Sequence, residues 1–477
     1  MQNQNSWKKV FFSGWICQFV LTLIGFNWVA YTLQEFGHIP WPAAVIGLIL
    51  FCSFASLHIP LGGLLWYFLS KKLNLQHLQK ILLLPLCISF FELTYPMIFD
   101  WHFGYTWYWA DWPGVQTSEI WGIKFLSVFS IFLNLLFYFA WSARHQKKQA
   151  LLYLGSAMIF FASINLGGFY LKKQLPPPNA SVNALIVQAN IGNLEKQYAE
   201  KGAGFTDFIV KEYFSLTESG LKEFANEPVD FAVWPETAFP VRMNPRYLSS
   251  GYGYQLVDFL KKNHIGLFTG AYGEDPRSQQ VSNSLFAFNN EGMILTPTYT
   301  KTVLLAFGEY IPGGDWIPKL YDWIPEVAQF ARGHGPVIQS FGNIHMGPQI
   351  CYEGLFDWFA RQSSILGSEI LINVTNDSWY GKWQERYQHL YMTLSRALEV
   401  RRPIIRSTNT GISSVALADG TILQTSPLHE KWKYLYKIPY FKNPTLTLFS
   451  KWGYWIPYLF LIFWGVCIFG IKQFTKS

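Results

Sequence analysis

The sequence predicts a multi-pass α-helical membrane domain joined to an α/β domain. Half of the 477 residues are hydrophobic, 18% are aromatic and only 14% are charged. The apolar residues gather in long runs near the two ends of the chain, while the middle is more polar. A typical soluble protein has about 25% charged residues, so a wholly soluble protein is disfavoured. The aromatic content excludes intrinsic disorder.

Apolar runs of about 20 residues are long enough to cross a bilayer. The sequence has six, over residues 11–33, 41–70, 81–99, 122–142, 151–171 and 453–471. A buried core helix is the alternative for any single run, but six runs with basic flanks favour the membrane. The first run is too long for a usual signal peptide and has no cleavage site after it, so we expect it to be retained. Residues 1–175 therefore form a five-helix domain, and residues 451–477 hold a sixth helix.

Basic residues indicate the topology. Those flanking the runs fall mostly on one side, and Lys124, Lys172, Lys173 and Lys451 are the exceptions. The positive-inside rule then places both termini in the cytoplasm and residues 176–450 outside. Glu92, inside the third run, is costly at bilayer depth and marks either a functional site or a structural pair with Lys124.

Residues 176–450 read as alternating strands and helices after a proline-rich spacer. We expect strands at 184–188, 231–234, 266–270, 284–288, 346–350 and 370–374, and helices at 205–225, 254–263 and 387–401. Short apolar strands alternating with helical patterns predict a single α/β domain.

Cys351 is the one cysteine in this polar middle, and it directly follows a predicted strand. A thiol at a strand-to-helix turn is typical of a nucleophile, whereas a lone cysteine is more often a structural core residue. Glu236 also follows a strand, and Trp234 could shield it from water and so raise its basicity. Taken singly, Glu236 would be a solvated carboxylate and Lys301 a surface lysine.

Several motifs in fixed order change these interpretations. They are Trp234-Pro-Glu236, Lys301, Phe307-Gly-Glu309-Tyr-Ile-Pro312, Ile350-Cys-Tyr-Glu353, Asn376-Asp-Ser-Trp379 and Arg406-Ser-Thr-Asn, preceded by Gly25-Phe-Asn-Trp28 in the first run. Together they resemble the nitrilase superfamily. Along nearly its whole length the chain is similar to the membrane-embedded family of that superfamily, the apolipoprotein N-acyltransferases. Members usually carry seven helices before the catalytic domain, and this chain has five.

The resemblance implies a nitrilase-like α-β-β-α sandwich over residues 176–450 with a Glu236, Lys301 and Cys351 triad. Glu236 would be the general base and Cys351 the nucleophile, its pKa lowered by the Lys301 ammonium. Lys301 and the backbone N–H of Tyr352 would stabilise the oxyanion.

Supporting roles follow from the same resemblance. Glu309 would hold Lys301 charged and in place, and Glu353 would gate the nucleophile or bind the incoming amine. Trp379 would line the entrance for the acyl chain or, as an equal alternative, belong to an aromatic belt at the membrane interface.

The implied reaction moves an acyl chain from a membrane phospholipid, through a Cys351 thioester, to the α-amino group of a diacylglyceryl cysteine in a lipoprotein. The implied place is the bacterial inner membrane, with the catalytic domain in the periplasm. We expect no cofactor, no metal and no nucleic-acid partner. Two alternatives remain: a membrane-tethered amidase of the nitrilase type, and a non-catalytic lipid-binding scaffold.

Overall fold

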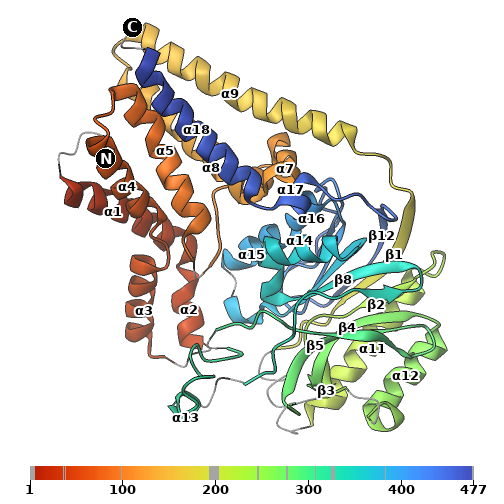
Figure 1. The fold of residues 1–477 in the computed structure, drawn as a ribbon. Coiled ribbons are helices and arrows are strands. Elements are labelled where there is room, and N and C mark those ends of the chain that lie inside the picture. The colour runs from red at the N-terminus through yellow and green to blue at the C-terminus, as the bar shows by residue number, and fades with distance from the viewer. Residues whose placement is uncertain are drawn as a thin grey trace. The chain divides into compact units, whose positions relative to one another are not determined.

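The structure is a computed structural model that describes residues 6–35, 37, 39–97, 99–192, 204–243, 247–275, 278–306, 308–323, 327, 329–381 and 383–474, apart from the side chains of 77, 379, 469 and 471–474. The chain divides into two compact units (Figure 1). The first comprises Met1–Leu175, Trp379–Ser395 and Thr447–Ser477, and the second comprises Pro176–Ser378 and Arg396–Leu446.

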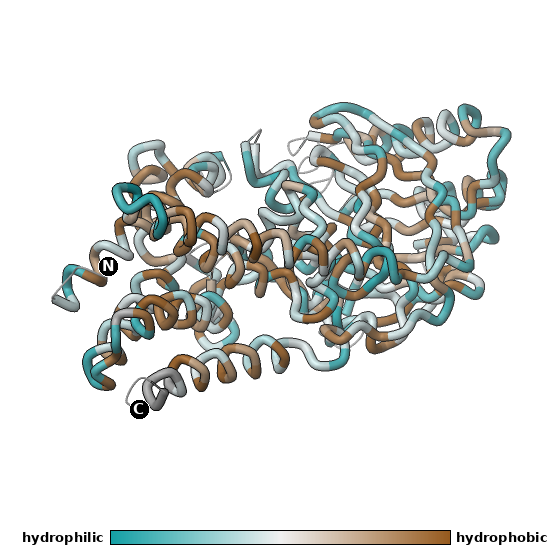
Figure 2. Tube along the Cα trace, turned by 90° about the horizontal axis from the view of Figure 1, so that it is seen from above, coloured by the Kyte–Doolittle hydropathy of each residue, from teal (hydrophilic) through white to brown (hydrophobic). Residues whose placement is uncertain are grey.

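The first unit is helical. Its α-helices are α1 (Trp7–Phe26), α2 (Trp28–Glu35), α3 (Trp41–Phe54), α4 (His58–Lys72), α5 (His77–Thr94), α6 (Tyr105–Trp109), α7 (Ser118–Trp121), α8 (Leu126–Ser142), α9 (Lys147–Gln174), α15 (Glu385–Leu394), α17 (Leu448–Trp452) and α18 (Trp455–Phe474). Figure 2 shows hydrophobic stretches running along these helices. This pattern suits helices whose outer faces contact lipid.

Four described segments are long and apolar enough to cross a membrane: Trp7–Phe26, Trp41–Lys72, Ile123–Ser142 and Lys147–Gln174. Helices α5 and α18 occupy the other two predicted runs, and Trp455–Ile468 is the apolar segment of α18 within the described side chains. The chain is thus a membrane protein. The first two predicted runs are each divided into two helices, with breaks at Asn27 and at residues 55–57. Pro60 lies in the first turn of α4, where a proline is tolerated, which favours a new helix beginning there.

Glu92 does not pair directly with Lys124. Its Oε1 lies 3.3 Å from Nδ1 of His102, whose Nε2 lies 2.8 Å from Oδ1 of Asp100. The other carboxylate oxygen of Asp100 pairs with the Lys124 ammonium. These four side chains therefore form one polar chain inside the helical unit, which favours the structural interpretation of Glu92.

Residues 379–395 were expected in the α/β domain, but they pack in the helical unit. Gln388 accepts a hydrogen bond from Nε1 of Trp28 at 3.1 Å and donates one to the carbonyl of Gly25 at 2.9 Å. The ring of Tyr391 stacks on Trp109 with centroids 4.6 Å apart. The helix expected over 387–401 is accordingly two helices, α15 and α16 (Arg396–Val400), which belong to different units.

The second unit contains two β-sheets. The first has strand order β12-β1-β2-β4-β5-β6, with β3 paired to β4. The second has the order β11-β10-β9-β8-β7. The strands are β1 (Ala180–Gln188), β2 (Phe231–Val233), β3 (Phe239–Arg242), β4 (Gly266–Glu274), β5 (Val281–Phe288), β6 (Ile294–Thr300), β7 (Gln339–Phe341), β8 (Ile344–Ile350), β9 (Ile370–Thr375), β10 (Ile404–Thr408), β11 (Ser414–Ala416) and β12 (Trp432–Tyr440). All six predicted strands are present, together with six that the sequence pattern missed.

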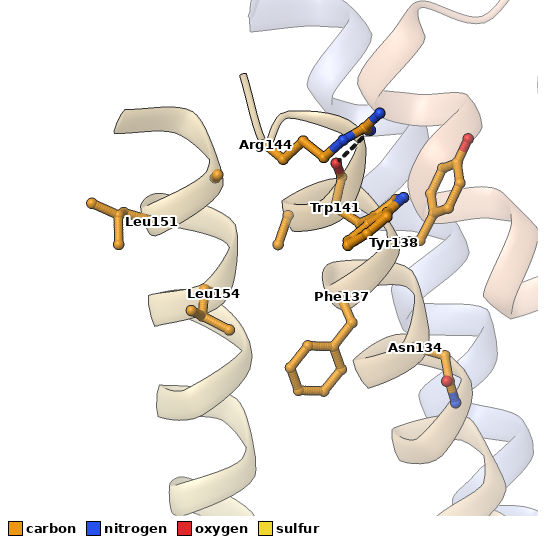
Figure 3. Close-up of a pocket in the computed structure, with 9 residues that line it drawn as sticks. Asn134, Phe137, Tyr138, Trp141, Arg144, Leu151 and Leu154 are labelled. Atoms are coloured by element: carbon orange, nitrogen blue, oxygen red, sulfur yellow. Dashed lines mark hydrogen bonds between the residues drawn. The ribbon is translucent and has the colours of Figure 1, made fainter. Parts of the chain in front are cut away.

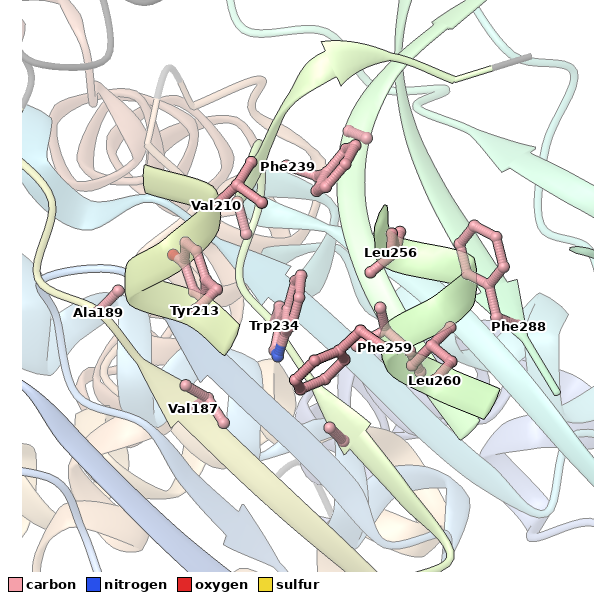
Figure 4. Close-up of a cluster of buried hydrophobic side chains, with 14 of the residues drawn as sticks. Val187, Ala189, Val210, Tyr213, Trp234, Phe239, Leu256, Phe259, Leu260 and Phe288 are labelled. Atoms are coloured by element: carbon pink, nitrogen blue, oxygen red, sulfur yellow. The ribbon is translucent and has the colours of Figure 1, made fainter. Parts of the chain in front are cut away.

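Successive side chains along a strand point to opposite faces of the sheet, and this alternation gives each sheet two packed faces. In β1, Ala184 and Ile186 face the second sheet, where they join residues such as Ile372 in the core between the sheets. Leu185 and Val187 face the opposite way, toward α11 (Phe205–Glu223) and α12 (Gly251–Asn263). Figure 4 shows this second core. With α14 (Asp357–Ile365) packed against β8 of the second sheet, the unit is an α-β-β-α sandwich, as predicted.

Candidate active site

Three of the predicted site residues lie just beyond the ends of strands in the second unit. Glu236 lies three residues after β2, Lys301 directly follows β6, and Cys351 directly follows β8. Strands β2 and β6 belong to the first sheet and β8 to the second. The site is therefore assembled from both sheets of the sandwich.

Lys301 is the centre of the site. Its ammonium donates to Oε1 of Glu236 at 3.2 Å and to Oε1 of Glu309 at 2.8 Å. The side chain is 1% exposed, so the interpretation as a surface lysine is wrong. Burial alone would lower the pKa of Lys301, but Glu236 and Glu309 together raise it well above its ordinary value. The ammonium is therefore fixed and charged.

A buried asparagine connects the two carboxylates. Nδ2 of Asn283, on β5, donates to Oε1 of Glu236 at 2.7 Å and to Oε1 of Glu309 at 3.1 Å. The other oxygen of Glu236 accepts the backbone N–H of Asn376 at 2.9 Å. Glu236 thus accepts from Lys301, Asn283 and Asn376, which fixes the direction of its carboxylate.

Trp234 does not shield Glu236 as expected. Its indole stacks on Tyr213 at 5.0 Å, and Nε1 donates to Oγ1 of Thr217 at 3.0 Å, both on α11. Figure 4 shows Trp234 and Tyr213 together in the core between α11 and the first sheet. The indole therefore anchors the end of β2 from the helix side.

Cys351 begins the 3-10 helix η4 (Cys351–Leu355) and adopts a left-handed backbone conformation with φ of 52°. A non-glycine residue in this region is strained. Nδ2 of Asn373 donates to the carbonyl of Cys351 at 3.2 Å, which holds this turn from the neighbouring strand β9. The predicted turn after the strand is present, although its helix is 3-10 rather than α.

The Cys351 thiol has a raised pKa, contrary to the expectation that Lys301 would lower it. Burial has the largest effect, and the Glu236 carboxylate adds to it, while Lys301 opposes both without cancelling them. Glu236, Glu309 and Lys301 together carry one net negative charge, so a thiolate would add a second. Cys351 is therefore a thiol at rest.

Glu353 is fully buried and accepts four hydrogen bonds. Its Oε1 accepts from the hydroxyl of Tyr299 at 2.6 Å and from the backbone N–H groups of Thr302 at 2.6 Å and Val303 at 2.9 Å. Its Oε2 accepts from the N–H of Ile350 at 2.7 Å. The carboxylate joins the segment after Lys301 to the turn at Cys351. Its two expected roles, gating and amine binding, stay predictions.

The remaining predicted residues are less informative. Tyr352 is half-buried, and its ring meets Phe356 edge to face at 4.9 Å. Trp379 lies in the 3-10 helix η5 (Asp377–Tyr380), but its side chain is outside the described part of the structure. Its expected contact with an acyl chain stays a prediction. Phe307 likewise lies outside the described residues.

Sequence reasoning missed a buried network beside Cys351. Nη2 of Arg406 donates to Oδ2 of Asp377 at 2.7 Å, and Nη1 donates to Oδ1 of Asn373 at 3.2 Å. Asn373 in turn holds the carbonyl of Cys351. Arg406 and Asp377 stand in motifs that carry the resemblance, whereas Asn373 lies in an apolar strand and has no such signal.

The described residues contain no group of three or more His, Cys, Asp or Glu side chains that could hold a metal ion. The side chains that the structure describes at the site offer one thiol, one ammonium and two carboxylates in a buried setting. This combination suits nucleophilic attack on a carbonyl with proton transfer to a carboxylate.

Comparisons with known proteins agree with this arrangement. Residues 1–136 match the apolipoprotein N-acyltransferase N-terminal domain, and residues 184–432 match the carbon-nitrogen hydrolase family. An apolipoprotein N-acyltransferase of Bdellovibrio bacteriovorus is 40% identical, covering 98% of this chain and 87% of that protein. One from Haemophilus ducreyi is 29% identical, covering 91% of this chain and 83% of that protein.

A solved carbon-nitrogen hydrolase from Helicobacter pylori G27 is 17% identical over 54% of this chain and 89% of that chain, and its TM-score of 0.38 is too low to add to the assignment. The two family matches and the Bdellovibrio relative are sufficient to assign the chain to a family. The chain belongs to the apolipoprotein N-acyltransferase family, and its α/β unit is a carbon-nitrogen hydrolase domain.

Proposed function

We propose that this protein transfers an acyl chain from a membrane phospholipid to the α-amino group of the N-terminal diacylglyceryl cysteine of lipoproteins. The observation that carries the proposal is the Lys301 ammonium held between Glu236 and Glu309, close enough to perturb the Cys351 thiol. Family membership supports N-acylation of an apolipoprotein, which is what the family name states, and the phospholipid donor and the diacylglyceryl cysteine are part of the proposal.

In the first half-reaction, Glu236 takes the proton of the Cys351 thiol as the sulfur attacks the sn-1 ester carbonyl. This transfer leaves the net charge of the buried cluster unchanged, which avoids the cost of a free thiolate there. The Lys301 ammonium and the backbone N–H of Tyr352 stabilise the oxyanion. The carbon–oxygen bond then breaks, and the leaving alkoxide takes the proton from Glu236. The products are a lysophospholipid and a Cys351 thioester.

In the second half-reaction, the α-amino group of the lipoprotein attacks the thioester carbonyl. Glu236 accepts a proton from the amine, the carbon–sulfur bond breaks, and the departing sulfur recovers that proton. The products are an N-acylated lipoprotein and the original thiol. The lysophospholipid leaves before the amine attacks the thioester, so the cycle is ping-pong. Each half-reaction returns Glu236 to a carboxylate, so the proton balance is closed without a cofactor.

The membrane helices have a physical role in this scheme. The chain enters the α/β unit from α9 and leaves it toward α18, so the domain is tethered to the membrane at both ends. Both substrates are lipids confined to a bilayer, and tethering raises their effective concentration at the enzyme. The positive-inside distribution supports a catalytic domain in the periplasm of a bacterial inner membrane.

A reconstituted assay tests the proposal. The full chain in proteoliposomes of phosphatidylethanolamine is given a synthetic diacylglyceryl-cysteine peptide, and the peptide is analysed by mass spectrometry. We expect one added acyl chain on the peptide amine with the wild type and none with Cys351→Ser. If the variant acylates the peptide, the assignment of Cys351 as the nucleophile is wrong. Release of free fatty acid at the same rate with and without peptide would instead favour a hydrolase.

A further inference from the structure

We propose that a cleft between α8 and α9 binds an anionic phospholipid. This site is separate from the residues that carry the proposed reaction. The cleft lies where α8 ends and α9 begins, and it has a volume of about 660 Å³ (Figure 3). It is lined by Asn134, Phe137, Tyr138, Ala140, Trp141, Arg144, Ala150, Leu151 and Leu154.

The walls of the cleft suit an acyl chain. Phe137 of α8 and Leu154 of α9 face the gap between the two helices (Figure 3). Both side chains are more than two-fifths exposed in the protein alone, as is Trp141. Only 6% of the apolar window of α9 is buried, so a large apolar surface beside the cleft is left for lipid to cover.

The position of the cleft along α9 fits the depth of a lipid headgroup. The uncharged part of α9, residues 150–171, spans about 33 Å at 1.5 Å per residue, close to the roughly 30 Å of a bilayer core. Leu154 then lies near the edge of the hydrocarbon, and Lys147 and Lys148 lie nearly two turns further out, among the headgroups. A lipid with its chain in the cleft would place its phosphate beside these cations.

Charge complementarity favours an anionic headgroup. Arg144, Lys147 and Lys148 are all exposed, and the sequence has no Asp or Glu between residues 125 and 194. The Arg144 guanidinium lies over the Trp141 ring, 5.1 Å from its centroid, and donates to the Trp141 carbonyl at 3.2 Å. Arg144 is therefore held at the mouth of the cleft.

A basic loop alone would follow from the positive-inside rule and would attract an anionic membrane without selecting one lipid. The difference here is that one of the cations, Arg144, lines an apolar cleft, and Lys147 and Lys148 follow it three and four residues along the chain. The loop between α4 and α5 offers a matched comparison, since it carries Lys71, Lys72 and Lys80 on the same predicted side of the membrane.

The test measures lipid binding, independently of activity. The full chain in detergent is titrated with phosphatidylglycerol or with phosphatidylethanolamine of the same acyl chains, and bound lipid is counted by native mass spectrometry. We expect a tightly bound phosphatidylglycerol in the wild type and in a K71Q/K72Q/K80Q control. An R144Q/K147Q/K148Q variant should bind it on the order of 100-fold more weakly, because each basic residue strengthens attraction to anionic lipid.

A second variant separates the cleft from simple surface charge. Leu154→Trp keeps every cation but fills the cleft, and it should also weaken phosphatidylglycerol binding. The proposal is overturned if the phospholipid binding that R144Q/K147Q/K148Q removes is as strong for phosphatidylethanolamine as for phosphatidylglycerol, if the two triple variants lose phosphatidylglycerol binding equally, or if Leu154→Trp binds phosphatidylglycerol as the wild type does.

Discussion

Gly270→Ala is expected to move the carboxylate of Glu236 without changing any side chain of the proposed reaction. Gly270 lies on β4, and its N–H donates to the carbonyl of Pro235 at 3.1 Å. A Cβ atom at this position would lie 2.6 Å from Cα of Glu236 and 2.6 Å from N of Thr237. Thr237 already has a left-handed backbone with φ of 48°, so the turn has little freedom to yield.

The size of the effect follows from that overlap. Ordinary contact begins at 3.4 Å, so the backbone at Glu236 must move by about 0.8 Å. A misplacement of about 1 Å at a reacting group costs on the order of 10²-fold in rate. We therefore expect thioester formation to slow by roughly 10²-fold, equivalent to about 2.7 kcal/mol of barrier.

The assay is the single-turnover rate of Cys351 acylation by phospholipid, followed by intact-protein mass spectrometry. Gly273→Ala on the same strand is the control, because its Cβ would meet only side-chain atoms of Ser282 and Ser284. Melting temperatures of both variants correct for lost stability. A folded Gly270→Ala protein that acylates within threefold of the wild type would refute the positional argument.

Three further predictions concern groups around the nucleophile. Lys301→Met should slow thioester formation by about 10² to 10³-fold and lower the melting temperature, because Glu236 loses its cation; a normal rate in this variant would remove Lys301 from the mechanism. Burial raises the pKa of Glu353 to about 7, so below that pH a proton occupies one of its acceptor positions and the rate of Cys351 acylation should fall. The Glu353→Gln variant should acylate slowly at all pH values. If the acid limb of the rate profile is unchanged in that variant, Glu353 is not the group that titrates. Asn373→Ala should slow acylation of Cys351 about tenfold, since one hydrogen bond of roughly 1 to 1.5 kcal/mol holds the nucleophile turn, and a rate equal to that of the wild type would exclude this positioning role.

Motif order, rather than single-residue propensity, predicted the candidate site residues. Lys301 alone reads as a surface lysine, and only its place between the motifs at Glu236 and Cys351 indicated a role in a catalytic triad. The sign of the Cys351 pKa shift could not be obtained in this way. It depends on how deeply the thiol is buried and on the net charge of its neighbours, which are properties of the folded site.

Other features depend on contacts between distant segments. Asn283 joins two carboxylates from the middle of an apolar strand, and no local pattern distinguishes it. The helix predicted over 387–401 is two helices: Gln388 and Tyr391 of the first contact Trp28 and Trp109 in the helical unit, whereas Arg396–Val400 belongs to the α/β unit. These contacts join distant segments, so no local pattern contains them.

The most direct test of the central claim is the covalent state of Cys351 after exposure to lipid. The purified full chain is incubated with a phospholipid carrying one defined sn-1 acyl chain and no acceptor, and its mass is then measured. The account predicts that this acyl group replaces one proton, maps to Cys351 and is removed by hydroxylamine. An acyl group on another residue, or an equal gain of mass by Cys351→Ala, would contradict it.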